Sequence, residues 1–249
     1  DNLIEEEVNG CVPLTFMLCV SVAGMLSGVL EEESIKVHMQ NDLQERTAGF
    51  FAVACGGKTK ETEGQKGHTY MVDKVLTLPE IVDEEGHLKL HEAIIAVSHE
   101  GKSNKTYDLP TAWLDIAPDV RWIKGRDSGV RILDFYHGIG GHSIPSIKRI
   151  FNIWGEEKLR RVLDCEIKKF KRCAKKRGKY REMPEEFFKQ IGMILTAYNV
   201  VEERYGLHTG KKKLVDFIFR NVTVLWHDQK VEYANEYRRI TMEGEYDYE

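Results

Sequence analysis

The sequence predicts an α+β protein with an N-terminal antiparallel β-rich domain, residues 1–145, a C-terminal helical domain, residues 146–242, and an acidic tail, residues 243–249. Short runs rich in β-branched and aromatic residues, separated by glycine-containing breaks, indicate strands up to about residue 136. After Pro145 the apolar residues recur every three to four positions, which is typical of amphipathic helices. The charge changes sign at the same place. Residues 1–150 hold 15 Lys and Arg against 23 Asp and Glu, whereas residues 151–242 hold 21 against 13.

The first element is an uncharged segment from Gly10 to Leu30, with three glutamates on each side of it. About 20 such residues are enough for a helix to cross a bilayer. Pro13 and several hydroxyl side chains lower its hydropathy, and neither flank carries the Lys or Arg that sets orientation. We interpret the segment as a buried core element and keep a membrane helix as the alternative. Because the chain begins at Asp1 rather than Met, we expect that it has been processed, trimmed or cut from a longer chain.

Six short runs of β-forming residues are expected to be the strands of the first domain. Glycine-rich breaks between them and few helical patterns favour an antiparallel sheet or a small barrel. The runs are Ser34–Met39, Gly49–Ala54, His68–Leu78, Leu88–Val97, Val120–Ile123 and Val130–Tyr136.

Two helices are expected in the second domain, and each has its own apolar stripe. The first carries Leu159, Val162 or Leu163, Ile167, Phe170 and Cys173 or Ala174, and it should end at Gly178. The second should begin after Pro184 and stop at Gly206. Residues 214–226 fit either a helix or a strand, because Val222, Thr223 and Val224 compete with the helical pattern. A last short helix is expected over 231–240.

The first of these helices is unusually basic. Residues 158–181 contain 12 Lys and Arg and two acidic residues, and one stripe along the helix is apolar. Such a helix suits a phosphate backbone or an anionic membrane surface. A second basic cluster stands at the expected start of a helix, where cations oppose the helix dipole and suggest an external anion. The predicted anion-binding residues are Lys158, Arg160, Arg161, Lys168, Lys169, Lys171, Arg172, Lys175, Lys176, Arg177, Lys211, Lys212 and Lys213.

One glycine-rich stretch suggests an alternative activity. Residues 132–143 read Ile-Leu-Asp-Phe-Tyr-His-Gly-Ile-Gly-Gly-His-Ser, which resembles the first nucleotide-binding motif of S-adenosylmethionine-dependent methyltransferases, above all the DNA cytosine methyltransferases. The resemblance covers about ten residues. It implies a cofactor site at Asp134, Gly138, Gly140 and Gly141. The Pro-Cys nucleophile of that family has no counterpart at Cys165 or Cys173. We interpret the stretch as a hinge between the two domains.

Histidine and cysteine spacing predicts no metal site and no disulfide framework. His87 and His91 are four residues apart, but the residues between them alternate as in a strand, so the two rings would be about 13 Å apart. The five cysteines form no Cys-x-x-Cys pair. Together these features favour a reducing intracellular compartment, cytoplasm or nucleus, and no cofactor.

We therefore predict a non-enzymatic binding and assembly protein whose basic helix contacts nucleic acid, RNA included, or an anionic membrane surface. Opposite charge on the two domains also favours homo-oligomers that pack head to tail. Structural proteins of virus particles often combine such duties, and by analogy alone we include a role of this kind in the prediction. The alternative is the methyltransferase that residues 134–141 imply.

Overall fold

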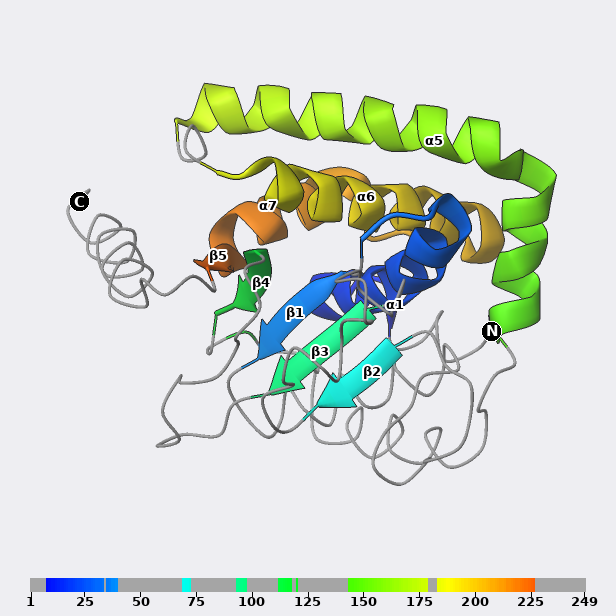
Figure 1. Ribbon diagram of the computed structural model, residues 1–249, viewed down its shortest axis with the longest axis horizontal. Helices are drawn as coiled ribbons and strands as arrows, with labels where there is room; N and C mark the ends of the chain where they lie inside the picture. The colour runs from blue at the N-terminus through cyan, green and yellow to red at the C-terminus, as the bar shows by residue number, and fades with distance from the viewer. Residues whose placement is uncertain are drawn as a thin grey trace, which may run out of the picture.

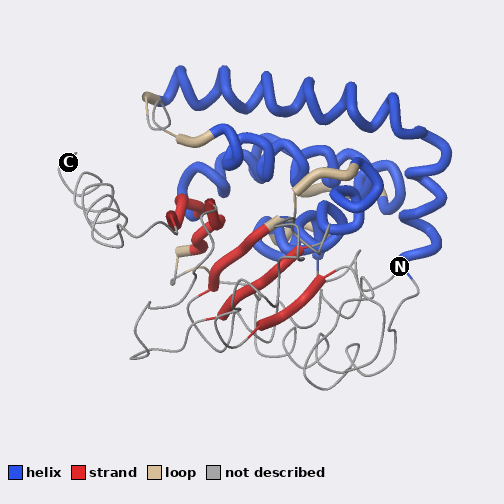
Figure 2. Tube along the Cα trace, viewed as in Figure 1, coloured by secondary structure: helices blue, strands red, loops and turns tan. Residues whose placement is uncertain are grey.

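The computed structural model describes residues 8–33, 35–39, 69–72, 93–97, 112–117, 120, 143–178 and 183–226. Within these ranges the chain is mostly helical, and the helices lie on one side of a small sheet (Figure 1, Figure 2). The outermost is the second half of α5, which lies over α6. The elements in order are α1 Val12–Leu30, β1 Lys36–Met39, β2 Thr69–Val72, β3 Ala93–Val97, β4 Ala112–Ile116, α5 Ser143–Arg177, α6 Glu185–Tyr205, α7 Lys211–Asn221 and β5 Val222–Trp226.

The described strands form one sheet in the order β2-β3-β1-β4-β5. Strands β2, β3, β1 and β4 are parallel to one another, with Val37 opposite both Ile95 and Leu114. The last strand, β5, is antiparallel to β4 and places Val224 opposite Leu114. The carboxyl ends of the four parallel strands therefore share one edge of the sheet.

The predicted antiparallel β-rich domain is not supported by this arrangement. Three predicted runs contain β1, β2 and β3, but these strands are short and parallel. A parallel neighbour needs a long crossover connection, and residues 40–68 and 73–92 are long enough for one. The continuous apolar run Ala93–Val97 is typical of a strand buried on both faces. Strand β4 was not predicted, because Asp115 interrupts its pattern. The runs Gly49–Ala54 and Val130–Tyr136 lie outside the described residues, and Val120 is described but is not in a strand.

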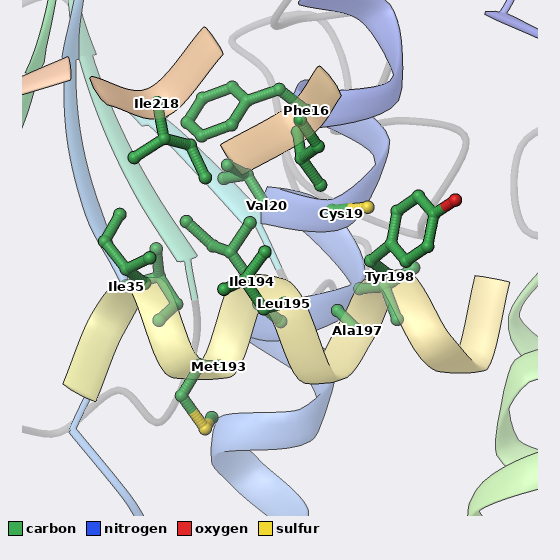
Figure 3. Close-up of a cluster of buried hydrophobic side chains, with 14 of the residues drawn as sticks. Phe16, Cys19, Val20, Ile35, Met193, Ile194, Leu195, Ala197, Tyr198 and Ile218 are labelled. Atoms are coloured by element: carbon green, nitrogen blue, oxygen red, sulfur yellow. The ribbon is translucent and has the colours of Figure 1, made fainter. Parts of the chain in front are cut away.

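The uncharged segment near the N-terminus is the central helix of the core. By length and composition α1 could cross a membrane, with a mean hydropathy of 1.9, but most of it is covered by protein. It packs against α6 and α7 on one side and the sheet on the other. Figure 3 shows Phe16 and Val20 of α1 beside Ile194 and Leu195 of α6 and Ile218 of α7. This supports the interpretation of the segment as a core element.

The two helix ends predicted around α6 are confirmed. Pro184 precedes its first turn, and Gly206 ends it with a left-handed φ of 63°. The segment 214–226, which fitted either a helix or a strand, contains both. Helix α7 ends at Asn221, and strand β5 begins at the β-branched Val222.

Helix α5 starts earlier than the basic pattern suggested and bends at Gly155. The φ of 69° and ψ of 160° at this residue are accessible mainly to glycine, and they divide the helix into two parts. Gly178 follows its last residue, as predicted. The bend directs the second, basic part of α5 along α6 (Figure 1).

Residues on both sides of position 145 share one hydrophobic core. Leu114 of β4, Ile194 of α6 and Val222 of β5 belong to the same buried cluster. The division into domains at residue 145 stays a prediction, and the acidic tail, 243–249, and the expected helix over 231–240 lie outside the described residues.

Candidate nucleic-acid interface

The second part of α5 has a sharply divided cross-section. Leu159, Leu163, Phe170 and Ala174 are buried and face the body of the protein. Phe170 lies among Phe187, Phe188 and Phe219, whose ring centroids are 4.8 to 6.3 Å away. The apolar stripe predicted from the sequence is confirmed at these positions, whereas Cys173, which was grouped with it, is exposed.

A buried carboxylate occupies one position of this apolar stripe. Glu166 has a side chain that is 5% exposed, and its Oε1 accepts hydrogen bonds from Lys169 at 3.3 Å and Lys211 at 3.2 Å. Lys211 also donates to the side-chain oxygen of Asn199. The Glu166 carboxylate is the main cause that raises the pKa of Lys169. The sequence interpretation treated Lys169 and Lys211 as open anion sites, but the protein itself supplies their anion.

Cations on the flanks of α5 attach the helix to its neighbours. Arg160 donates to Glu156 at 2.8 Å and to the carbonyl oxygen of Leu30, and it lies 3.5 Å from Glu32. The hydrogen bond to Glu156 contributes most to raising the pKa of Arg160. These contacts join the helix to the end of α1.

Two more flank cations reach α6 and α7. Lys171 pairs with Glu185 of α6, and its ammonium lies 5.4 Å from the ring centroid of Phe188. Arg177 pairs with Asp216 of α7 and lies 4.3 Å from the ring centroid of Phe219. Arg160, Lys171 and Arg177 therefore hold α5 against its neighbours. The sequence pattern alone could not distinguish these cations from cations that bind an external anion.

A third group of cations points outward. Arg161, Lys168, Arg172 and Lys175 follow one another at seven-, four- and three-residue steps, so they lie in one row along the solvent face, with Lys176 beside Lys175. All five are exposed. Among the described residues, no carboxylate lies within ion-pairing distance of Lys168, Arg172, Lys175 or Lys176. Arg161 has a loose pair with Glu157 at 3.9 Å.

We name Lys168, Arg172, Lys175 and Lys176 the open ridge of α5. From Arg161 to Lys176 the solvent face is about 22 Å long at 1.5 Å per residue. Lys212 and Lys213 are also exposed, next to Lys211, which contacts Glu166 of α5. Lys158 lies at the other end, with its ammonium 4.0 Å from the ring centroid of Trp154.

The other candidate sites predicted from the sequence are not part of this basic surface. Asp134, Gly138, Gly140 and Gly141, the candidate cofactor residues, lie outside the described residues, as do His87 and His91. Within the described ranges no three His, Cys, Asp or Glu residues are grouped as metal ligands would be. A cavity of about 140 Å³ lies where β1 begins, and Glu33, Glu186 and Lys189 are among its lining residues.

Sequence reasoning missed two buried carboxylates, Glu166 and Asp115. Glu166 stands at a stripe position, seven residues after Leu159 and four before Phe170, so its burial could have been read from the spacing. Asp115 is 3% exposed in β4, where it lies opposite His38 and Thr223. No periodic signal marks Asp115, because β4 itself was not recognised.

No family model matches the chain, and no curated protein matches it. Among solved structures, the chain is similar to one titled "SCCmec type IV Cch - active helicase", with a TM-score of 0.69 and 13% sequence identity. The match covers 88% of this chain and 49% of that one, so this chain spans about half the length of that chain. At this identity the likeness is one of fold, and it extends over most of the chain.

Proposed function

We propose that this chain is a nucleic-acid-binding protein that contacts phosphate groups through the open ridge of α5. The observation that carries the proposal is the division of the cations on α5. Those on the flanks are neutralised by Glu32, Glu185 and Asp216, whereas the four of the open ridge have no carboxylate partner among the described residues. An uncompensated row of Lys and Arg on an outer helix favours a polyanionic partner.

Two features favour nucleic acid over an anionic membrane. A helix that lies in a membrane interface inserts an apolar face among the lipids. The apolar stripe of α5 is already buried in the protein core, and the exposed large apolar side chains in the described part, Val29 and Ile153, are not on the open ridge. The similar fold of a protein titled as a helicase also supports nucleic acid. Self-assembly through opposite charge, a virus-particle role included, and an intracellular location are further parts of this proposal.

A salt series with two matched variants tests the proposal. The first variant, Lys168→Gln/Lys175→Gln, removes two cations of the open ridge. The second, Lys171→Gln/Lys189→Gln, removes two lysines that pair with Glu185 and Glu32. Both lower the net charge equally. Each lost phosphate contact should reduce the slope of log K against log salt by about 0.9. We expect the first variant to lose about two units of slope and the second to lose almost none.

Four results would count against the proposal. The wild-type protein could fail to bind RNA or DNA at low salt. Its affinity could be independent of salt. The two variants could lose equal affinity, which would mean that net charge rather than the open ridge determines binding. Flotation with acidic liposomes in the same buffers provides the membrane comparison, and stronger binding there than to nucleic acid would also contradict the proposal.

A further inference from the structure

The open ridge has the shape of a straight rod on the outside of the molecule. The basic part of α5 runs along α6 as the outermost described helix (Figure 1). The buried residues Leu163 and Phe170 occupy the opposite side of the helix. The ridge is therefore convex, and it presents its cations at one-turn intervals.

Positive charge predominates on this face, where Asp164 is the one exposed acid between positions 161 and 176. Its exposed residues between positions 161 and 176 are Arg161, Asp164, Cys165, Lys168, Lys169, Arg172, Cys173, Lys175 and Lys176. None is aromatic. The nearest aromatic residue along α5 on the solvent side is Trp154, which is half-buried. Lys158 covers one face of its ring, and its indole N–H donates to Glu203 at 2.9 Å. No free ring therefore stands on this face for a base to stack on.

These two features favour a double-stranded over a single-stranded nucleic acid as the ligand. Proteins that hold single strands combine a positive groove with aromatic side chains, and each stacked base contributes about 1–3 kcal/mol. A convex ridge of Lys and Arg offers neither a groove nor a ring. A duplex supplies a denser row of charge, about one phosphate per 1.7 Å of axis, and its major groove, about 12 Å wide, admits an α-helix.

We infer that the partner of α5 is a duplex, bound through its phosphates and without preference for base sequence. This inference rests on the proposed function and names its ligand class. Lys168 and Lys175 are about 10 Å apart along the helix, so they reach different phosphates of the duplex. Asn and Gln, the side chains that pair with adenine, are absent from positions 168–175, and most hydrogen bonds between proteins and DNA, those from Lys and Arg included, go to phosphate and sugar.

Fluorescence anisotropy with nucleic acids of equal nucleotide number tests this inference. The probes are a 12-base-pair duplex, a second duplex of unrelated sequence, and a 24-nucleotide single strand without self-complementarity. We expect both duplexes to bind with dissociation constants within threefold of each other. We expect the single strand to bind at least tenfold more weakly at the same salt. In the variant Lys168→Gln/Arg172→Gln/Lys175→Gln/Lys176→Gln the preference for the duplex should disappear.

The outcomes distinguish this inference from the proposed function. Equal or tighter binding of the single strand overturns the duplex inference and leaves nucleic-acid binding in place. A difference above tenfold between the two duplexes overturns contact through the phosphates alone. Failure of all three probes to bind overturns both. Circular dichroism of the fourfold variant checks that its helices are intact, and a folded variant that keeps the duplex preference also overturns the inference.

Discussion

Two buried charges show how the surroundings of a single residue decide its effect. Glu166 is surrounded by donors from Lys169, Lys211 and Asn199. The side chain of Lys36 is 1% exposed, its Nζ has no hydrogen-bond partner, and the carboxylate of Glu33 lies 3.6 Å away. Desolvation by burial lowers the pKa of Lys36, and the nearby Glu33 and Glu186 oppose that shift. A buried ion without hydrogen bonds costs free energy. We therefore expect the charge on Glu166 to stabilise the folded protein and the charge on Lys36 to destabilise it.

Replacement of Lys36 by Met should therefore stabilise the protein or leave it unchanged. The methionine has a similar length, and Glu33 is 53% exposed, so water can solvate the carboxylate that loses its partner. We expect the free energy of unfolding to rise by about 1 kcal/mol. Urea denaturation measures it, with Lys168→Met as an exposed control that should change stability by less than about 0.5 kcal/mol. A loss above about 1 kcal/mol for the Lys36 variant would show that its pair with Glu33 stabilises the fold.

At the scale of elements, the close approach of α5 and α6 depends on one glycine. A Cβ at position 192 of α6 would lie 2.3 Å from Cγ1 of Ile167 on α5. This distance is far below van der Waals contact, so the helices would have to separate or Ile167 would have to leave its position. The apolar face of α5, and with it the placement of the open ridge, therefore depends on a small residue at this crossing.

The variant Gly192→Ala should be less stable by about 1–3 kcal/mol, although alanine is the better helix former. The double variant Gly192→Ala/Ile167→Ala removes the atom that clashes. A double-mutant cycle should then give a coupling energy of about 1 kcal/mol or more. Additive effects of the two substitutions would contradict the close packing described here.

The pair Arg177–Asp216 joins the end of α5 to α7 and makes this contact sensitive to pH. The hydrogen bond from Arg177 lowers the pKa of Asp216 from its usual 3.8. A carboxylate whose pKa is lower in the folded state stabilises the protein at pH values above the unfolded pKa. That stabilisation disappears as the pH falls through the folded pKa.

We therefore expect Asp216→Asn to melt below the wild-type protein at pH 6–7 and to approach it as the pH falls below about 4. Thermal melts across this range measure the difference. The variant Arg177→Gln should keep part of its deficit in acid, because it also loses the contact with the ring of Phe219. A deficit for Asp216→Asn that is the same at all pH values would exclude the charged pair as its cause.

At the scale of the whole molecule, local patterns predicted the helices well and the sheet poorly. The stripe of α5, the proline and glycine ends of α6 and the start of α7 at Lys211 all depend on residues close together in the sequence. The strand directions depend on long connections, so alternation within a run could not show that β1, β3 and β4 are parallel. The addition of β5 to β4 joins residues more than a hundred positions apart.

The candidate site shows the same limit. The sequence predicted that α5 is basic, but it could not divide the cations into those that pack and those that remain open. That division depends on acids from distant elements, such as Glu32 for Arg160, Glu185 for Lys171 and Asp216 for Arg177. Helical spacing gives the direction of each side chain, and tertiary contact decides whether it is neutralised.

Alkylation of Cys165 tests most directly whether the open ridge meets nucleic acid. Cys165 is exposed on α5, four residues after Arg161 and three before Lys168, so it lies in the outward row, whereas Cys173 is exposed outside that row. We predict that bound duplex slows maleimide labelling of Cys165 more than that of Cys173, measured by peptide mass spectrometry, and that high salt removes the protection. Unchanged labelling of Cys165 while anisotropy shows the duplex to be bound would contradict the account, because the ligand would then occupy another surface.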